Sequence, residues 1–481
     1  MALSLRRDRE APRGRYTPNL WPVWIVAPVA LIAAGALGWV IYHYAYDHFA
    51  QAAADQTGQK PPKPVNINDP LKATVTALTL IGAVLAGLYA YRKQLLAEGD
   101  AHRADASQLA DRYTTAAEQL GHDQAAVRLA GVYALARLAD DWAEQRQVCI
   151  DVLCAYLRMP YEPDPTAAGH KEGEREVRQT IIRVIRDHLQ QPDVPTAWCE
   201  YNFDFTGAVF DGGSFSTSHF RGMVDFGGAT FSDSTINFRG ATFSDSTINF
   251  RGATFSDGMV DFVGATFSRG TVAFHGATFR GGMVDFGDAR FLGVTVTFGY
   301  VPFRGATFSG GSRVGFGRAT FIGGKIDFGS ATFRDGTVDF GSATFTGTML
   351  DFDSATFSGG RVDFDDAKFR GGTVDFGHVM LSDGTIDFGR ATFIGGTADF
   401  DGATFSRGTV DFRHATFDGG TADFRGATFD GGTVTFGDAR FKDGRIDFGY
   451  ATVNGGTVTF DGATFSGTSF DWGPVPVPAG A

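Results

Sequence analysis

The chain has 481 residues, a formal net charge of −12, 46 phenylalanines and three cysteines. From residue 201 onward it holds about 31 Asp, no Glu and about 21 Lys or Arg, so the acidity lies there and the front of the chain is close to neutral. This length predicts more than one domain. The spacing of Cys149, Cys154 and Cys199 excludes a disulfide framework and a cysteine-based metal site.

Two apolar stretches near the N-terminus predict a transmembrane hairpin. Residues 1–20 form a basic tail, and residues 21–46 have no formally charged side chain and are long enough to cross a bilayer. A polar linker at 47–70 leads to a second predicted span at 71–91, which a pair of basic residues follows. Because basic residues flank the hairpin on both sides, the positive-inside rule predicts a multi-pass protein of the plasma membrane with both termini cytoplasmic and an extracytoplasmic linker.

Two features of these spans leave alternatives open. A signal peptide competes for the first stretch, although its apolar core would be shorter and a small-residue cleavage site would follow it. Ala34 and Gly38, and Ala83 and Gly87, form small-x-x-x-small pairs that would let two helices approach closely. The alternative is that small residues are simply common in an alanine-rich chain.

Residues 92–195 predict a small cytoplasmic block of α-helices. Asp123 is expected to cap a helix over 124–139, and two further helices follow it on either side of a Pro- and Gly-punctuated loop at 161–173. The run at 127–139 resembles one helix of a HEAT-type repeat.

The stretch 196–472 repeats one twelve-residue unit, A-T-F-x-x-G-x-V-D-F-x-x, some twenty times. In one copy Ala253 and Phe255 alternate with Thr254, and alternation of period two predicts short strands with apolar residues inward and Thr or Asp outward. One unit per coil would crowd two Phe rings into a very thin tube. Two units per coil give four short strands and four inward Phe rings per layer, and this geometry is preferred.

The sequence therefore predicts a mainly β fold, a four-sided parallel β-helix of about ten coils whose layers stack roughly 4.8 Å apart. The helical block is expected to cover its first coil, because an open end exposes unpaired backbone groups. The segment 473–481 is expected to act as a C-terminal cap and tail.

The segments Ala-Thr-Phe-Ser-Asp at 253–257, Ala-Thr-Phe-Arg-Asp at 331–335 and Ala-Thr-Phe-Asp-Gly at 427–431 resemble the pentapeptide-repeat family. The resemblance implies a right-handed quadrilateral β-helix and a non-enzymatic protein. The Phe residues depart from the family pattern, because they fall alternately five and seven residues apart. The hairpin, helical block and repeats together resemble membrane-anchored pentapeptide-repeat proteins of actinobacteria.

The repeat is irregular at about 299–318. Phe298, Phe303 and Phe308 are five apart, which indicates one inserted pentapeptide, and an extra residue follows before Phe321. An added side should move the strand types round by one face, so the Thr and Asp ladders are predicted to exchange faces there.

An Asp ladder is the most prominent surface feature of the repeats. Its members recur every twelve residues: Asp327, Asp339, Asp351, Asp363, Asp375, Asp387, Asp399, Asp411 and Asp423. One interpretation is a solvated face that discourages edge aggregation. The other comes from the resemblance, because some family members resemble DNA in shape and charge and bind type II topoisomerases. Interspersed Arg residues, the predicted anchor and the missing dimerisation helix argue against it.

Parts of the repeat are also similar to calcium-binding and ice-binding solenoids. The Gly- and Asp-rich units have a period of twelve, not the nine of calcium β-rolls, and the second half of that motif is absent. A Thr ladder that includes Thr254, Thr266 and Thr278 is similar to those of ice-binding solenoids. A cytoplasmic location argues against that role, and Thr is in any case a good strand former.

No catalytic, cofactor-binding or metal-binding residue is predicted, and no cofactor. The His residues of the repeats, His219, His275, His378 and His414, are widely separated. The predicted function is a non-enzymatic, membrane-anchored scaffold that displays a repetitive surface to an unidentified protein partner, without direct nucleic-acid binding. The alternative is an acidic DNA mimic that regulates a type II topoisomerase.

Overall fold

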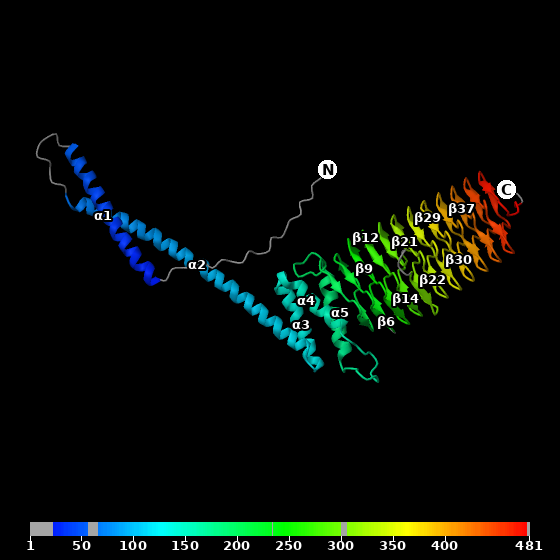
Figure 1. The fold of residues 1–481 in the computed structure, drawn as a ribbon, viewed down its shortest axis with the longest axis horizontal. Coiled ribbons are helices and arrows are strands. Elements are labelled where there is room, and N and C mark those ends of the chain that lie inside the picture. Colours follow the sequence, from blue (N-terminus) through cyan, green and yellow to red (C-terminus); the bar gives the residue numbers. More distant parts are fainter. Residues whose placement is uncertain (1–22, 56–65, 233, 300–304, 479–481) are drawn as a thin grey trace. The chain divides into compact units, whose positions relative to one another are not determined.

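The computed structural model describes residues 23–55, 66–232, 234–299 and 305–478. The chain divides into two compact units, Met1–Gln108 and Leu109–Ala481. Figure 1 shows helices in the first part of the chain and stacked short strands in the rest.

Two helices make up the described part of the first unit. α1 spans Val23–Asp55, and α2 begins at Asn68 and runs on to Leu120 in the second unit. α1 thus extends into the stretch 47–70 expected to be a linker, because its alanine-rich end favours helix. Of the described residues, one segment, Asn68–Gln94, is long and apolar enough to cross a membrane. The other predicted span, 21–46, begins outside the described residues.

α1 and α2 pack against each other at one of the predicted small residues. Gly38 is buried, and a Cβ built on it would lie 3.1 Å from Leu78 Cδ1, so a larger side chain would push the helices apart. The other predicted pair, Ala83 and Gly87, is exposed, and a Cβ on Gly87 would meet nothing within 4 Å. The prediction for that second pair is wrong, because the helices meet near the start of α2 and leave this part of it uncovered.

The helical block comprises the end of α2 and four further helices. They are α3 (Ala125–Asp141), the 3₁₀ turn η1 (Ala143–Gln145), α4 (Arg146–Arg158) and α5 (Glu174–Leu189). Gly131 of α3 lets α2 approach closely, because a Cβ there would lie 2.5 Å from the backbone N of Leu120. The predicted Asp123 cap is wrong. Gln124 holds the N-cap position, and its N–H donates to His122 Nδ1 at 3.0 Å.

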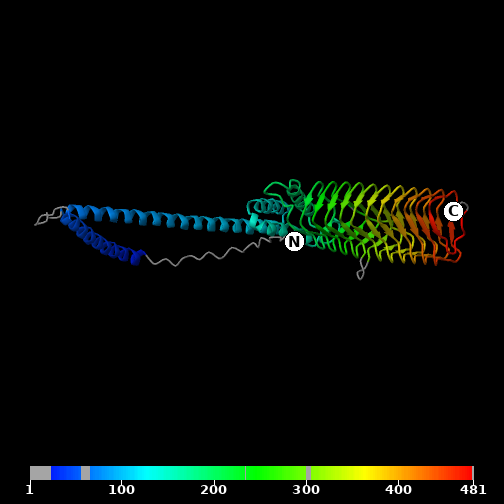
Figure 2. The ribbon, with the colours of Figure 1, turned by 90° about the horizontal axis from the view of Figure 1, so that it is seen from above.

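The second unit continues as a quadrilateral parallel β-helix whose described strands form four sheets, labelled A to D in chain order round the coil. Paired residues are 24 apart in regular coils, as for Phe255 and Phe279, which confirms two units per coil. There are about eleven coils, against about ten predicted. Figure 2 shows the strands as successive rungs from the helical block to the C-terminus.

The strands of sheets A and C come from the Val-Asp half of the repeat unit and are called V-D strands. The third residue of each strand is usually Asp. Sheet A contains β1 (Phe203–Asp204), β5 (Val224–Asp225), β9 (Thr247–Asn249), β13 (Thr271–Ala273), β17 (Thr295–Thr297), β21 (Lys325–Asp327), β25 (Met349–Asp351), β29 (Thr373–Asp375), β33 (Thr397–Asp399), β37 (Thr421–Asp423), β41 (Arg445–Asp447) and β45 (Ser469–Asp471). Sheet C contains β3 (Gly213–Ser214), β7 (Thr235–Asn237), β11 (Met259–Asp261), β15 (Met283–Asp285), β19 (Arg313–Gly315), β23 (Thr337–Asp339), β27 (Arg361–Asp363), β31 (Thr385–Asp387), β35 (Thr409–Asp411), β39 (Thr433–Thr435) and β43 (Thr457–Thr459).

The strands of sheets B and D come from the Thr-Phe half of the repeat unit and are called T-F strands. Sheet B contains β2 (Val209–Phe210), β6 (Thr230–Ser232), β10 (Thr254–Ser256), β14 (Thr278–Arg280), β18 (Thr307–Ser309), β22 (Thr332–Phe333), β26 (Thr356–Phe357), β30 (Met380–Leu381), β34 (Thr404–Phe405), β38 (Thr428–Phe429) and β42 (Thr452–Val453). Sheet D contains β4 (His219–Phe220), β8 (Thr242–Ser244), β12 (Thr266–Ser268), β16 (Arg290–Leu292), β20 (Thr320–Ile322), β24 (Thr344–Thr346), β28 (Lys368–Arg370), β32 (Thr392–Ile394), β36 (Thr416–Asp418), β40 (Arg440–Lys442) and β44 (Thr464–Ser466).

Phenylalanine rings fill the centre of the β-helix. In one column Phe364, Phe388 and Phe412 stack with centroids 4.7 and 4.8 Å apart, which matches the spacing of paired strands. All three rings are fully buried. Each buried Phe contributes about 1.5–3 kcal/mol before entropy is subtracted, so the ring columns hold the coils together.

The predicted exchange of faces at 299–318 is wrong. β14 pairs with β18 as Phe279 with Phe308, and β15 pairs with β19 as Val284 with Val314, so both strand types stay on their own sheets. The Ala306 N–H donates to Phe298 O at 2.6 Å, as at regular turns, so the coil closes there as it does elsewhere and no side is added. The predicted core position of Phe303 lies outside the described residues. The later extra residue falls in the next turn, beside Gly310 and Gly311.

The helical block covers the first coil, as predicted. Gln147 of α4 exchanges two hydrogen bonds with the backbone of Asn202, at 2.9 and 3.1 Å. Ile182 of α5 lies on Gly213 of β3, where a Cβ would be 2.8 Å from its Cδ1. These contacts satisfy and shield backbone groups that an open end would expose.

Candidate functional site

The predicted Asp ladder forms two columns, one on sheet A and one on sheet C. Asp351 pairs in register with Asp375 on sheet A, and Asp363 pairs with Asp387 on sheet C. Alternate members therefore stack, as predicted. Their side chains are less exposed than expected: Asp327 and Asp411 each expose 7% of their surface.

Each Asp closes the turn that follows it. The Oδ1 of Asp375 accepts the N–H of Gly377 at 2.8 Å, and the Oδ1 of Asp387 accepts that of Gly389 at the same distance. Such Asx turns explain why Asp recurs at this position. The Oδ1 of Asn249 accepts the N–H of Arg251 in the same way, at 3.1 Å. The Asp columns therefore have a structural role in the turns. Their carboxylates also accept from side chains, as Asp411 does from Arg413 through both oxygens.

Cations of the same or the preceding coil neutralise parts of both columns. On sheet A, Lys325 Nζ lies 2.9 Å from Asp327 and 2.7 Å from Asp351. On sheet C, Arg361 bridges Asp363 and Asp387 at 2.9 and 2.7 Å. Further pairs join Arg313 to Asp339, Arg413 to Asp411, Arg425 to Asp423 and Arg445 to Asp447.

Asp375 and Asp399 form an unneutralised segment of the sheet A column, since neither has an ion pair with a residue that the structure describes. Burial raises the pKa of Asp375 above its ordinary value, and the charges of Asp351 and Asp399 raise it further. Burial likewise raises the pKa of Asp399, with Asp423 and Asp401 adding to the effect. By contrast, the Gly449 N–H and the Arg445 guanidinium hold the pKa of Asp447 below its ordinary value although burial opposes them.

Sheet D has the opposite charge. Its outward positions include Arg290, Lys368, Arg370, Arg440 and Lys442, all exposed, and one acid, Asp418. Lys442 pairs with Asp418 at 3.2 Å, and the other four have no ion pair with a described residue. Sorting the sequence by a 24-residue period would have separated these residues from the outward positions of sheet B, which the twelve-residue unit superimposes on them.

The Thr ladder and the His residues are dispersed over the sheets. Thr254 and Thr278 lie on sheet B, whereas Thr266 lies on sheet D. The four His residues belong to different coils. His275 is bonded to Thr297 Oγ1 at 2.6 Å, and burial lowers its pKa; His378 lies 3.1 Å from Asp353.

No group of three or more potential metal ligands occurs among the described residues. The absence of catalytic and cofactor sites stays a prediction.

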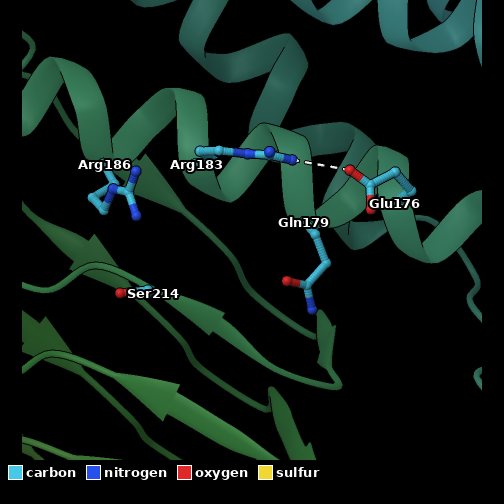
Figure 3. A pocket seen from close by; sticks show the side chains of 5 residues that line it. All are labelled: Glu176, Gln179, Arg183, Arg186 and Ser214. Atoms are coloured by element: carbon cyan, nitrogen blue, oxygen red, sulfur yellow. Dashed lines mark hydrogen bonds and ion pairs between the residues drawn. The ribbon is translucent and has the colours of Figure 1, made fainter.

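A shallow depression of about 300 Å³ lies between α5 and β3 (Figure 3). Glu176, Gln179, Arg183, Arg186 and Ser214 line it. Its cations are already paired, Arg183 with Glu176 at 3.0 Å and Arg186 with Asp187 at 2.7 Å. The depression is therefore a polar surface hollow without a free charge for a ligand.

Comparisons with known proteins bear on the β-helix. Residues 205–249 match the family model described as pentapeptide repeats (9 copies). Among solved structures, the chain is similar to a trypsin-treated variant of QnrB1, described as a plasmid-mediated fluoroquinolone resistance protein. That likeness has 15% sequence identity and a TM-score of 0.17, and covers 52% of this chain and 91% of the other. No curated protein matches the chain.

Proposed function

The chain belongs to the pentapeptide-repeat family through its β-helix, and on that premise we propose that it is a non-enzymatic, membrane-anchored scaffold. Two helices, one in each predicted span, hold it in the plasma membrane with both termini cytoplasmic. The β-helix presents its faces to protein partners. The likeness to actinobacterial membrane proteins stays a prediction.

The uncovered apolar surface of the first unit is the observation that carries this proposal. Leu80 and Leu85 expose 64% and 58% of their surface, and Trp39 of α1 exposes 64%. Exposed apolar side chains of this density mark a surface that lies against lipid or protein. The packing of α1 on α2 through Gly38 supports a helical hairpin in that setting.

The faces of the β-helix support the scaffold role. Adjacent sheets differ in charge, with Asp columns on A and C and free cations on D. A DNA mimic requires continuous negative charge, and the cations of sheet D interrupt it. The alternative of a topoisomerase-binding mimic rests on the rod shape and the net charge of −12, which the family resemblance links to such mimics. Unchanged gyrase supercoiling in the presence of the full chain would dismiss it.

Alkaline carbonate extraction tests the anchor. We expect the full chain to stay in the membrane pellet, and Leu80→Arg with Leu85→Arg to release it, because each charge near the centre of a span costs about 2.5–3.5 kcal/mol. Leu96→Arg, just beyond the candidate span and also exposed, is the matched control and should leave the chain in the pellet. Extraction of the unchanged chain would refute the anchor.

Labelling of Thr57→Cys in intact cells tests the orientation. We expect a membrane-impermeant maleimide to react without lysis, since the predicted linker is extracytoplasmic. Reaction only after lysis would place the linker in the cytoplasm.

A further inference from the structure

We propose that β-helices of separate copies of this chain pack side by side, with sheet D of one copy against sheet A of the next. The inference goes beyond the proposed function and does not depend on the membrane anchor. It rests on two complementary surfaces that lie on adjacent sides of the same coils.

The first surface is the exposed row of cations and isoleucines on sheet D. Lys368 and Arg370 lie on β28, and neither pairs with an acid that the structure describes. Ile322 and Ile394 occupy the same outward column and expose 47% and 45% of their surface. Elsewhere on the β-helix most Arg residues bind an Asp of their own copy. The positive charge of this row is therefore available to bind carboxylates of another molecule.

The second surface is the unneutralised segment of sheet A. Asp375 and Asp399 have no ion pair with a described residue, although the more distant charge of Arg425 acts on Asp399, and Asp353 at the neighbouring turn contacts His378 at 3.1 Å and Ser354 Oγ at 3.2 Å. Asp401 adds a fourth carboxylate at the next turn. Burial and the charges of neighbouring carboxylates leave Asp375 and Asp399 with an unfavourable environment that cations from another molecule would relieve.

The two surfaces lie at the same height along the β-helix. β28, with Lys368 and Arg370, is followed directly by β29, with Asp375, and β32, with Ile394, is followed by β33, with Asp399. Both sheets repeat at the rise of one coil, roughly 4.8 Å. Two parallel copies side by side therefore place cations opposite carboxylates in the same coils, and stay in register over neighbouring coils.

Adjacent sides of a four-sided coil differ by a quarter-turn, so repeating this contact closes a ring of four copies. The contact is heterologous, and closure rather than an open filament follows from the quarter-turn. The corner between sheets D and A would lie at the centre. At Gly371, Gly395 and Gly419 this corner has no side chain, and a Cβ there would meet nothing within 4 Å.

Each single contact is weak, because exposed ion pairs are typically worth 0.2–1 kcal/mol. In the ring every copy uses both surfaces, so the contacts add up. Nucleic acid is a poorer occupant of sheet D, since the exposed isoleucines offer nothing to phosphate and the Asp column of sheet A adjoins it. A second copy satisfies both surfaces at once.

Cysteine cross-linking between two tagged forms of the full chain tests the contact. One form carries Thr346→Cys on sheet D and the other Met349→Cys on sheet A, both exposed residues of the same coil. The native cysteines are buried, and burial raises the pKa of Cys149 and Cys199 to about 11, so they do not compete. We expect a mixed disulfide between the two forms. Ser358→Cys on the sheet B side is the matched control and should not cross-link.

A charge exchange tests the chemistry of the contact. Lys368→Glu with Arg370→Glu in the sheet D form should lower the cross-link yield at least five-fold. Adding Thr373→Lys and Thr397→Lys to the sheet A form should restore it. These lysines copy Lys325, which the chain already places two residues before an Asp. Restoration also shows that the first variant is folded.

Three outcomes would overturn the proposal. They are equal cross-linking from Ser358→Cys, a yield that the glutamates leave unchanged, and preferential disulfides between identical forms. Light scattering of the unmodified full chain in mild detergent tests the closure separately. A mass of four chains is expected, and a dimer or an open series of masses would refute the ring. If duplex DNA shifted in gel mobility with the chain, Lys368→Glu with Arg370→Glu abolished that shift, and no cross-link formed, sheet D would be assigned to nucleic acid instead.

Discussion

The Asp of each sheet A or C strand shows how one residue can serve both fold and surface. Its Oδ1 closes a turn in nearly every coil, for example from Asp285 to the Gly287 N–H at 2.8 Å. Its other oxygen meets a cation where the chain supplies one, as at Asp387. The residue is therefore retained for a local backbone reason, and its charge is neutralised only in those coils where a nearby Lys or Arg reaches it.

Asp285 gives a clean test of the turn, because it has no ion pair with a described residue. Asp285→Ala should weaken the local structure by about 1 kcal/mol, the usual worth of one hydrogen bond, and so speed amide exchange around Gly287 about five-fold. Asp285→Asn should change it little, because Asn249 makes the same bond in its own coil. Hydrogen exchange of the full chain measures both. Equal effects of Ala and Asn would mean that the bond does not hold the turn.

The raised pKa values of Asp375 and Asp399 predict a stability gain from Asp375→Asn with Asp399→Asn at neutral pH. The folded state binds these protons more readily than the unfolded state, so native stability falls as pH rises from the ordinary value of 3.8 through the raised values. Asn keeps the turn bond and removes the charge.

The thermal midpoint of the double Asn variant should therefore exceed that of the native chain at pH 7. The difference should vanish below about pH 4, where the native carboxylates are protonated in both states. Asp285→Asn, which keeps the turn bond on sheet C, is the control for the amide substitution itself. A constant difference at all pH values would contradict the assignment.

At the scale of elements, the strands tolerate irregular turns because pairing is decided by the strands themselves. The five extra residues after Phe298 do not add a side, since Phe279 and Val284 keep their partners in the next coil. An extra side would have brought V-D strands under T-F strands and broken the ring columns. Looping out costs only the entropy of a longer turn, which grows slowly with length.

Removal of residues 300–304 should therefore leave every strand on its sheet. Gly299 and Gly305 would then form a two-residue turn, like the Arg251-Gly252 turn of another coil. The shorter loop should stabilise the β-helix by about 1 kcal/mol, from the length dependence of loop closure. Thermal unfolding and the pattern of amide protection before and after residue 306 check this. A loss of protection beyond 306 would show that the insertion sets the register.

At the scale of the whole β-helix, the molecule is a stack of coils in which each contacts its neighbours. Its stability should then be close to a sum over coils and their interfaces. The start is covered by the helical block. At the other end Trp472 stacks on Phe470 with centroids 4.7 Å apart, while Phe460 and Phe465 stay partly exposed. Removing a coil from the interior should leave both ends intact.

Deletion of residues 228–251 removes one full coil and recreates the same Gly-Gly-Ala-Thr-Phe junction, because Gly227 then precedes Gly252. We expect a folded chain with a modestly lower thermal midpoint and every downstream residue on its original sheet. Deletion of 228–239 removes half a coil and should turn the downstream part by half a turn. The distance between one spin label placed N-terminal to the deletion site and one placed C-terminal to it distinguishes the full-coil variant from the half-coil variant. An unfolded full-coil variant would refute the additive description.

The sequence by itself determined the repeat, its period and the inward residues, because alternation and a fixed spacing leave few ways to bury so many Phe side chains. It also indicated that Gly38 permits close helix packing and that helices cover the first coil. Only the tertiary structure decided which residues share a face. Residues twelve apart fall on opposite sides of the coil and residues 24 apart on the same side, so the cations of sheet D separate from the mostly uncharged outward positions of sheet B only once the coil is built. Whether an insertion adds a side or loops out also depends on pairing across coils, which no local pattern records.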